Sequence, residues 1–137
     1  MDKPRISWVD RKGYIACEVV KGWPSYTGKP SWNTYLYIHD KEMVDYLWTE
    51  NCKKYDWGTV YQPNDMLENL DWHCGQTFYH QIIQDGGHRY IHIGDDYQHH
   101  GDEDRDYTEQ YLMDNITHIR EQLLEAWNRR SSEKEGA

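Results

Sequence analysis

The stretch Asn-Thr-Tyr-Leu-Tyr-Ile-His at residues 33–39 constrains the fold most, because its side chains alternate cleanly between two kinds. Successive side chains of a β-strand point to opposite faces of the sheet. Leu36 and Ile38 therefore share one face, and Tyr35, Tyr37 and His39 share the other. The alternation predicts a strand with the core on one side and a ring-lined surface on the other.

Four further segments have the composition of strands and are arranged in pairs. Residues 5–9 and 14–20 are short and rich in β-branched residues, and an Asp-Arg-Lys-Gly turn separates them, which predicts a hairpin. Residues 73–83 and 88–94 flank Gln-Asp-Gly-Gly, a sequence typical of a tight hairpin turn. These pairs predict an antiparallel sheet.

Two segments carry apolar residues at helical spacing. The segment 40–54 begins with Asp40, a good N-cap, and places Met43, Val44 and Leu47 on one face. The segment 106–130 is longer and has a continuous apolar face. The residues of that face are Leu112, Ile116, Ile119, Leu123 and Trp127. Between the two helices, most of residues 55–72 is expected to be loop.

These elements predict a single α+β domain, with an antiparallel sheet, a short helix and a long C-terminal amphipathic helix packed on one face of the sheet. The length of 137 residues suits one domain. We place this domain at residues 1–130 and expect residues 131–137 to form a frayed tail.

The composition restricts the class of protein. A net charge of -9 argues against direct binding to a nucleic-acid backbone, which requires clustered Lys and Arg. It does not exclude a small nucleotide in a local basic pocket, and it favours a protein with a basic surface as the partner. The three cysteines form no Cys-X-X-Cys pair, and no apolar run is long enough to span a membrane. We therefore expect a cytoplasmic protein.

The acidic loop, residues 95–106, permits several interpretations. His73, Asp96, His99 and Asp102 combine imidazole and carboxylate groups, which bind divalent metals. The same groups suit acid–base catalysis, although the sequence has no nucleophile elbow and no phosphate-binding glycine loop. A purely structural role is the third interpretation, in which the aspartates and His99 hold turns together.

Three segments of the chain, residues 22–28 (GWPSYTG), 73–78 (HCGQTF) and 94–102 (GDDYQHHGD), resemble the elements GHPxYG, HGGLTY and GFDxAHxGD. In this order the three elements resemble an uncharacterised family of small bacteriophage and prophage proteins. The matching positions are Gly22, Pro24, Tyr26, His73, Gly75, Thr77, Gly94, Asp96, His99, Gly101 and Asp102. The chain departs from the pattern with Trp23 in place of His, Cys74 in place of Gly, and Thr27 inserted before Gly28. The resemblance implies a phage or mobile-element context and brings no known activity.

The leading hypothesis is a small binding protein that is not an enzyme and antagonises a bacterial defence system. In one version an acidic surface imitates nucleic acid and occupies a protein partner. The residues expected to contact such a partner are Asp95, Glu103, Asp104, Asp106, Trp23 and Tyr26. In the other version the protein sequesters a signalling nucleotide.

For nucleotide sequestration, rings of the N-terminal half would stack on the base, and Lys21, Lys29 or Arg89 would meet the phosphate. These rings are Trp8, Tyr14, Trp23, Tyr26, Trp32, Tyr35 and Tyr37. Neither version needs a cofactor. The alternatives are a small metal-dependent enzyme that uses His73, Asp96, His99 and Asp102 with a divalent metal, and a structural or regulatory phage protein.

Overall fold

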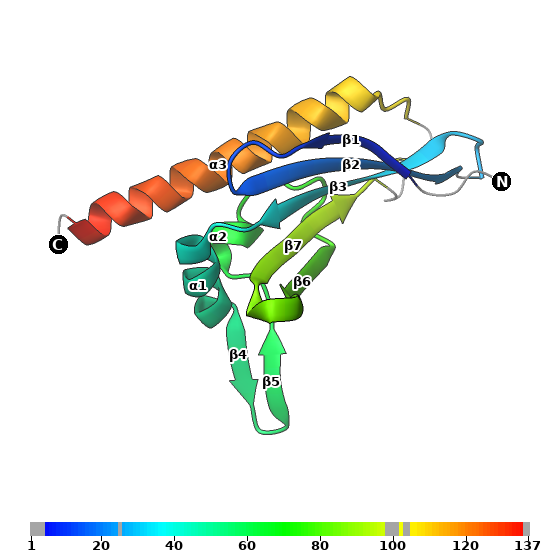
Figure 1. The fold of residues 1–137 in the computed structure, drawn as a ribbon. Coiled ribbons are helices and arrows are strands. Elements are labelled where there is room, and N and C mark those ends of the chain that lie inside the picture. The colour runs from blue at the N-terminus through cyan, green and yellow to red at the C-terminus, as the bar shows by residue number, and fades with distance from the viewer. Residues whose placement is uncertain (1–4, 25, 98–101, 103–104, 136–137) are drawn as a thin grey trace.

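A five-stranded antiparallel sheet forms the centre of the molecule, with the strands in the order β1-β2-β3-β7-β6 (Figure 1). The structure is a computed structural model, and it describes residues 5–24, 26–97, 102 and 105–135. The strands of this sheet are β1 (Arg5–Asp10), β2 (Ile15–Pro24), β3 (Pro30–Ile38), β6 (Phe78–Ile83) and β7 (Arg89–Asp96). A short 3-10 turn, η1 (Asp85–Gly87), connects β6 to β7.

The alternation in β3 determines the two faces of the sheet, as predicted. In this central strand Leu36 and Ile38 are fully buried, while Tyr35 and Tyr37 are only partly buried. The neighbouring strands β2 and β7 have the same two faces, because Leu36 pairs in register with Cys17 of β2 and Ile93 of β7. The inner face of the sheet is therefore apolar and the outer face carries rings.

Three helices contribute to the core on the inner face: α1 (Lys41–Glu50), α2 (Asp65–Glu68) and α3 (Glu109–Glu135). The long helix α3 lies along β1, β2 and β3, and its apolar face is buried as predicted (Figure 1). In α1, the N-cap Asp40 accepts a hydrogen bond from the backbone N–H of Met43 at 2.9 Å. The predicted α+β architecture is confirmed.

The structure differs from the prediction in the segment between α1 and β6. Residues 52–61 form a second, two-stranded sheet of β4 (Cys52–Tyr55) and β5 (Gly58–Tyr61), and α2 follows. This hairpin projects away from the main sheet (Figure 1). Its strands are only four residues long and its turn lacks an Asn-Gly or Asp-Gly pair, so the usual hairpin signal is missing.

Three boundaries also differ. Helix α1 ends at Glu50, not at residue 54 as expected, and β4 begins at Cys52. The strand expected from residue 73 begins at Phe78, because Cys74 and Gly75 have positive φ angles of 58° and 89° and turn the chain. Helix α3 continues to Glu135, beyond the expected start of a frayed tail at residue 131. The Arg130 guanidinium lies 3.7 Å from the centre of the Tyr46 ring and helps to attach this end of α3 to α1. Within the described residues, no helix is both long and apolar enough to cross a membrane.

Candidate functional site

The structure brings two of the four predicted His/Asp residues together. His73 Nε2 lies 2.9 Å from each carboxylate oxygen of Asp102, and the Tyr107 hydroxyl donates to Asp102 Oδ1 at 2.6 Å. The His73 ring also stacks in parallel on Tyr97, with ring centres 4.1 Å apart. We call His73, Tyr97, Asp102 and Tyr107 the His73 cluster. It connects the turn before β6 to the loop after β7.

Asp95 was expected on the outside of the acidic loop, and this expectation is wrong. Its side chain is 1% exposed, and it accepts hydrogen bonds from the His73 backbone N–H at 2.6 Å and from the Thr34 hydroxyl. The cause is the two-residue period of β7, which places Asp95 on the same inner face as Ile91 and Ile93. Burial raises the pKa of Asp95 to about 6.

The other predicted site residues are separated from one another. Asp96 is half-buried on the outer face and pairs in register with Asn33. Asp106 is exposed and forms an ion pair with Lys29 at 3.1 Å. Trp23 and Tyr26 are both exposed. His99, Glu103 and Asp104 lie outside the described residues.

The predicted metal site is not assembled within the part of the chain that the structure describes. No group of three or more His, Cys, Asp or Glu side chains is placed there to hold a metal ion. Besides Asp102, Asp95 contacts His73, because it accepts a hydrogen bond from the His73 backbone N–H. The contacts of the His73 cluster suit the structural interpretation for Asp102. Asp95, which that interpretation did not include, also fixes the turn at His73 to the sheet.

The outer face of the sheet carries a continuous layer of rings, as the alternation in β3 predicts. We call this the ring-lined face, and its members are Tyr35, Tyr37, His39, Phe78, His80, His88, Tyr90 and His92. The Tyr37 and His92 rings stack with centres 4.1 Å apart, and Tyr35 meets Phe78 edge-on at 5.3 Å. His39 Nδ1 and His88 Nε2 form a hydrogen bond of 3.0 Å. These contacts hold each ring in a defined orientation.

His92, at the centre of this face, is neutral near pH 7. Burial, together with the nearby His80, lowers the pKa of His92 to about 4. Its Nε2 atom is buried without a hydrogen-bond partner. The centre of the ring-lined face therefore suits stacking and apolar contact better than binding of a charge.

A pocket of about 520 Å³ adjoins the ring-lined face beside the turn between β1 and β2. We call it the Glu18 pocket, and its lining is Val9, Arg11, Gly13, Tyr14, Ala16, Glu18, Tyr37 and His39. Ala16 lies opposite Tyr37 in the register of β2 and β3, and its short side chain leaves the space open. The volume lies within the roughly 300–1,000 Å³ that is typical of small-molecule sites.

Glu18 is an unusual residue in this pocket because its carboxylate is largely buried. Its exposed fraction is 8%, and it accepts a hydrogen bond of 2.9 Å from the Tyr37 hydroxyl. No cationic side chain pairs with Glu18 among the described residues. Burial, with the neighbouring Glu18 carboxylate as a further cause, raises the pKa of Tyr37 far above its ordinary value, so this hydroxyl remains a donor.

Arg11 supplies a positive charge at the same pocket. The neighbouring Asp10 pairs with Arg120 at 2.9 Å, and this contact lowers the pKa of Asp10. The Asp10 carboxylate is therefore already paired with Arg120. Arg11 is exposed, and no described carboxylate forms an ion pair with it. Tyr14 stands at the rim and is also exposed.

The cations that the sequence suggested for phosphate binding lie elsewhere. Lys29 pairs with Asp106, and Arg89 pairs with Asp45 and lies over the Trp48 ring. Lys21 lies 5.8 Å from the centre of the Trp32 ring. Sequence reasoning missed Arg11 because it interpreted the Asp-Arg-Lys-Gly segment only as a turn. It also missed Glu18, whose place opposite Tyr35 depends on the strand register.

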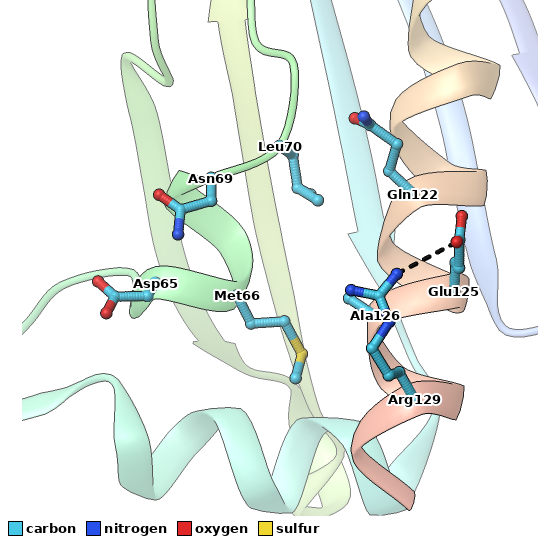
Figure 2. A pocket seen from close by; sticks show the side chains of 8 residues that line it. All are labelled: Asp65, Met66, Asn69, Leu70, Gln122, Glu125, Ala126 and Arg129. Carbon is cyan, nitrogen blue, oxygen red and sulfur yellow. Dashed lines mark hydrogen bonds and ion pairs between the residues drawn. The ribbon is translucent and has the colours of Figure 1, made fainter. Parts of the chain in front are cut away.

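Two further pockets have less suitable chemistry. One of about 400 Å³ lies between the α2 region and α3, where Met66 and Leu70 face the helix and Arg129 is paired with Glu125 at 3.1 Å (Figure 2). The other, of about 560 Å³, lies on the far side of the β1–β2 turn and contains Arg120, which Asp10 already neutralises. In both, the arginine is already engaged by a carboxylate.

Comparison with models of known protein families, with curated protein sequences and with solved structures finds no match to this chain. The resemblance to small phage proteins therefore stays a prediction.

Proposed function

We propose that this protein binds and sequesters a small phosphorylated ligand of the nucleotide class, without chemical conversion of that ligand. The observation that carries the proposal is the Glu18 pocket, where the rings of Tyr37 and His39, the guanidinium of Arg11 and the buried carboxylate of Glu18 converge. A nucleotide offers a matching group to each of them: a planar base, a phosphate and a hydrogen-bonding base edge.

Tyr37 is the residue best placed to stack on a base. Its neighbours in register are His92 on β7 and Ala16 on β2. His92 covers one side of the Tyr37 ring, so the side above Ala16 borders the pocket. Stacking between a base and an aromatic side chain contributes about 1–3 kcal/mol.

Arg11 is suited to bind the phosphate. A guanidinium forms two parallel charge-assisted hydrogen bonds with phosphate oxygens. Because no described carboxylate pairs with Arg11, binding a phosphate would not require an existing ion pair to break. This local charge makes a phosphate ligand compatible with an acidic protein.

The surrounding rings favour binding by reducing its entropic cost. Tyr37 contacts His92 and Tyr90, and His39 contacts Tyr90 and His88, so these side chains are ordered before the ligand arrives. The described lining contains no serine, threonine or cysteine, and its carboxylate, Glu18, accepts a hydrogen bond from the Tyr37 hydroxyl. These features suit retention of a ligand rather than its turnover.

The defence-antagonist hypothesis has two versions: an acidic surface that imitates nucleic acid, and sequestration of a signalling nucleotide. The contacts of the acidic residues favour sequestration. Of the acids expected at that surface, Asp95 is buried and hydrogen-bonded, and Asp106 forms an ion pair with Lys29. These two carboxylates therefore already have partners within the protein. A phage protein that removed a signalling nucleotide would silence a defence system that depends on that signal.

Isothermal titration calorimetry tests this function with a panel of nucleoside monophosphates, the corresponding nucleosides and cyclic dinucleotides. We expect the wild type to bind at least one nucleotide. Arg11→Ala should weaken nucleotide binding roughly tenfold or more, because it removes charge-assisted hydrogen bonds, and it should change nucleoside binding little. Tyr37→Leu should weaken both, because it removes the stacking surface.

Arg129→Ala is the matched control, since it removes an exposed arginine from the pocket between α2 and α3. It should leave binding unchanged. Mass spectrometry of the released ligand should show an unaltered nucleotide. Absence of binding to the whole panel, or equal binding by wild type and Arg11→Ala, would contradict the proposed function.

A further inference from the structure

We infer that the Glu18 pocket selects guanine among the bases, and that the Glu18 carboxylate is the group that distinguishes it. This inference rests on the proposed function, since it assigns the base of the nucleotide. It starts from a buried carboxylate that lines an open pocket and has one hydrogen bond among the described residues.

The unused acceptor capacity of Glu18 indicates what the ligand must offer. An ionised carboxylate has two oxygens and accepts up to about four hydrogen bonds. Among the residues that the structure describes, only the Tyr37 hydroxyl donates a hydrogen bond to Glu18. Because a buried charge is costly unless it is paired and hydrogen-bonded, a ligand with N–H donors is favoured at this position.

A positively charged ligand would also satisfy Glu18, but Arg11 lines the same pocket. Like charges in one pocket repel each other, so a cationic amine is disfavoured. A ligand fits both residues if it has a neutral group with two N–H donors for Glu18 and a separate anionic group for Arg11. A nucleotide whose base donates hydrogen bonds has both groups, because it also carries a phosphate.

Guanine is the common base that presents two adjacent donors along one edge, from its ring N1–H and its exocyclic amine. These two groups match the two oxygens of a carboxylate. Adenine places an unprotonated ring nitrogen at the equivalent position, cytosine places one beside its single amine, and uracil has one N–H between two carbonyls. Each of these bases would set an acceptor against the carboxylate, which disfavours binding.

Tyr37 contributes both to stacking on the base and to positioning Glu18 for hydrogen bonds with the edge of the base. Its ring borders the pocket, and its hydroxyl, in the plane of that ring, reaches Glu18. A base stacked on the ring would lie one layer away from the ring plane, with an edge beside the second oxygen of Glu18, which accepts no hydrogen bond among the described residues. The short Ala16 side chain leaves room for this arrangement.

The test compares GMP, IMP and AMP by calorimetry on the wild type, Glu18→Gln and a control variant. GMP should bind roughly tenfold or more tightly than AMP. IMP lacks the exocyclic amine and keeps N1–H, so its affinity should lie between the two. Glu18→Gln should weaken GMP binding roughly tenfold or more and remove the preference, because the amide replaces one acceptor with a donor. Glu50→Gln, an exposed site on α1, removes the same charge and should change nothing.

The outcomes separate the two proposals. If no nucleotide binds to the wild type, both are overturned. If the three nucleotides bind equally and Arg11→Ala weakens all of them, the proposed function stands and the guanine inference is overturned. A GMP preference that persists in folded Glu18→Gln overturns the role of Glu18. The wild-type series needs no variant, so the guanine preference is tested even if Glu18→Gln fails to fold.

Discussion

At the scale of single residues, Cys74 adopts a backbone conformation that its side chain disfavours. Its φ of 58° lies in the left-handed region, which is easily accessible only to glycine. The residue is exposed, so its side chain contributes little packing there.

We expect Cys74→Gly to stabilise the protein by about 0.5–1 kcal/mol, because relief of the left-handed strain exceeds the entropic cost of glycine. Thermal unfolding should show a rise in Tm of roughly 2–4 °C. The reverse change at the next position, Gly75→Ala, is the control, and it should destabilise because φ there is 89°. An unchanged or lower Tm for Cys74→Gly would show that the turn carries no strain.

Asp95 connects the stability of the protein to pH. Its pKa is raised from 3.8 to about 6 in the folded protein, and burial is the largest cause. Because the folded protein holds this proton more tightly than the unfolded chain, the contribution to stability is present below about pH 4 and is lost as pH rises through about 6.

We therefore expect the stability of the wild type, relative to Asp95→Asn, to fall by about 3 kcal/mol between about pH 4 and pH 7. Urea unfolding at several pH values measures this difference. Asp114→Asn, on the exposed side of α3, controls for the loss of one carboxylate. A difference between wild type and Asp95→Asn that does not change with pH would contradict a raised pKa.

The errors at the residue scale have a simple physical origin. Asp95 and Asp96 are adjacent in a strand, so one of them must face the core and the other the outer side. We expected Asp95 to face a partner and Asp96 to hold a turn or a metal. The apolar residues Ile91 and Ile93 determine which alternate positions of β7 face the core, and Asp95 occupies the next of these positions.

At the scale of elements, the segments with clear periodicity were predicted well. The alternation of β3 and the apolar face of α3 are local patterns that only a buried face explains. The hairpin of β4 and β5 and the short α2 were missed. Their strands and helix are only four residues long, too short for a period to be visible.

Two adjacent leucines of α3 allow a direct test of which face of the helix is buried. Leu123 is fully buried and Leu124 is 41% exposed. We expect Leu123→Ala to cost about 2–5 kcal/mol through the cavity it leaves, and Leu124→Ala to change stability by less than about 0.5 kcal/mol. Chemical denaturation measures both. Similar costs for the two variants would show that α3 is rotated about its axis.

At the scale of the whole molecule, stability is expected to be uneven. The hairpin of β4 and β5 pairs only with itself and has an exposed Trp57 at its turn. Isolated two-stranded hairpins are marginally stable. Its base is better attached, because the Gln62 N–H donates to the Asn51 carbonyl at 2.7 Å.

We expect amide hydrogen exchange to reflect this difference. Backbone amides near Trp57 should exchange orders of magnitude faster than those of β3, and the Gln62 amide should be intermediate. Nuclear magnetic resonance measures these rates residue by residue. Equal protection of the hairpin and β3 would mean that the hairpin unfolds only together with the whole protein.

The global arrangement was only partly accessible from the sequence. The two hairpins and the covering helix follow from local patterns, and together they predict the α+β class. The pairing of β3 with β7 joins segments far apart in the chain, and no local signal specifies it. The Glu18 pocket depends on the register that sets Ala16 opposite Tyr37, so it becomes visible only once strands are aligned.

The position of α3 in the chain has a consequence for synthesis in the cell. This helix covers the inner face of β1, β2 and β3, yet every strand precedes it in the sequence. While the ribosome makes the intervening segments, the apolar side chains of the first three strands have no helix to cover them. The nascent chain is therefore expected to need protection from aggregation, by chaperones, until α3 emerges.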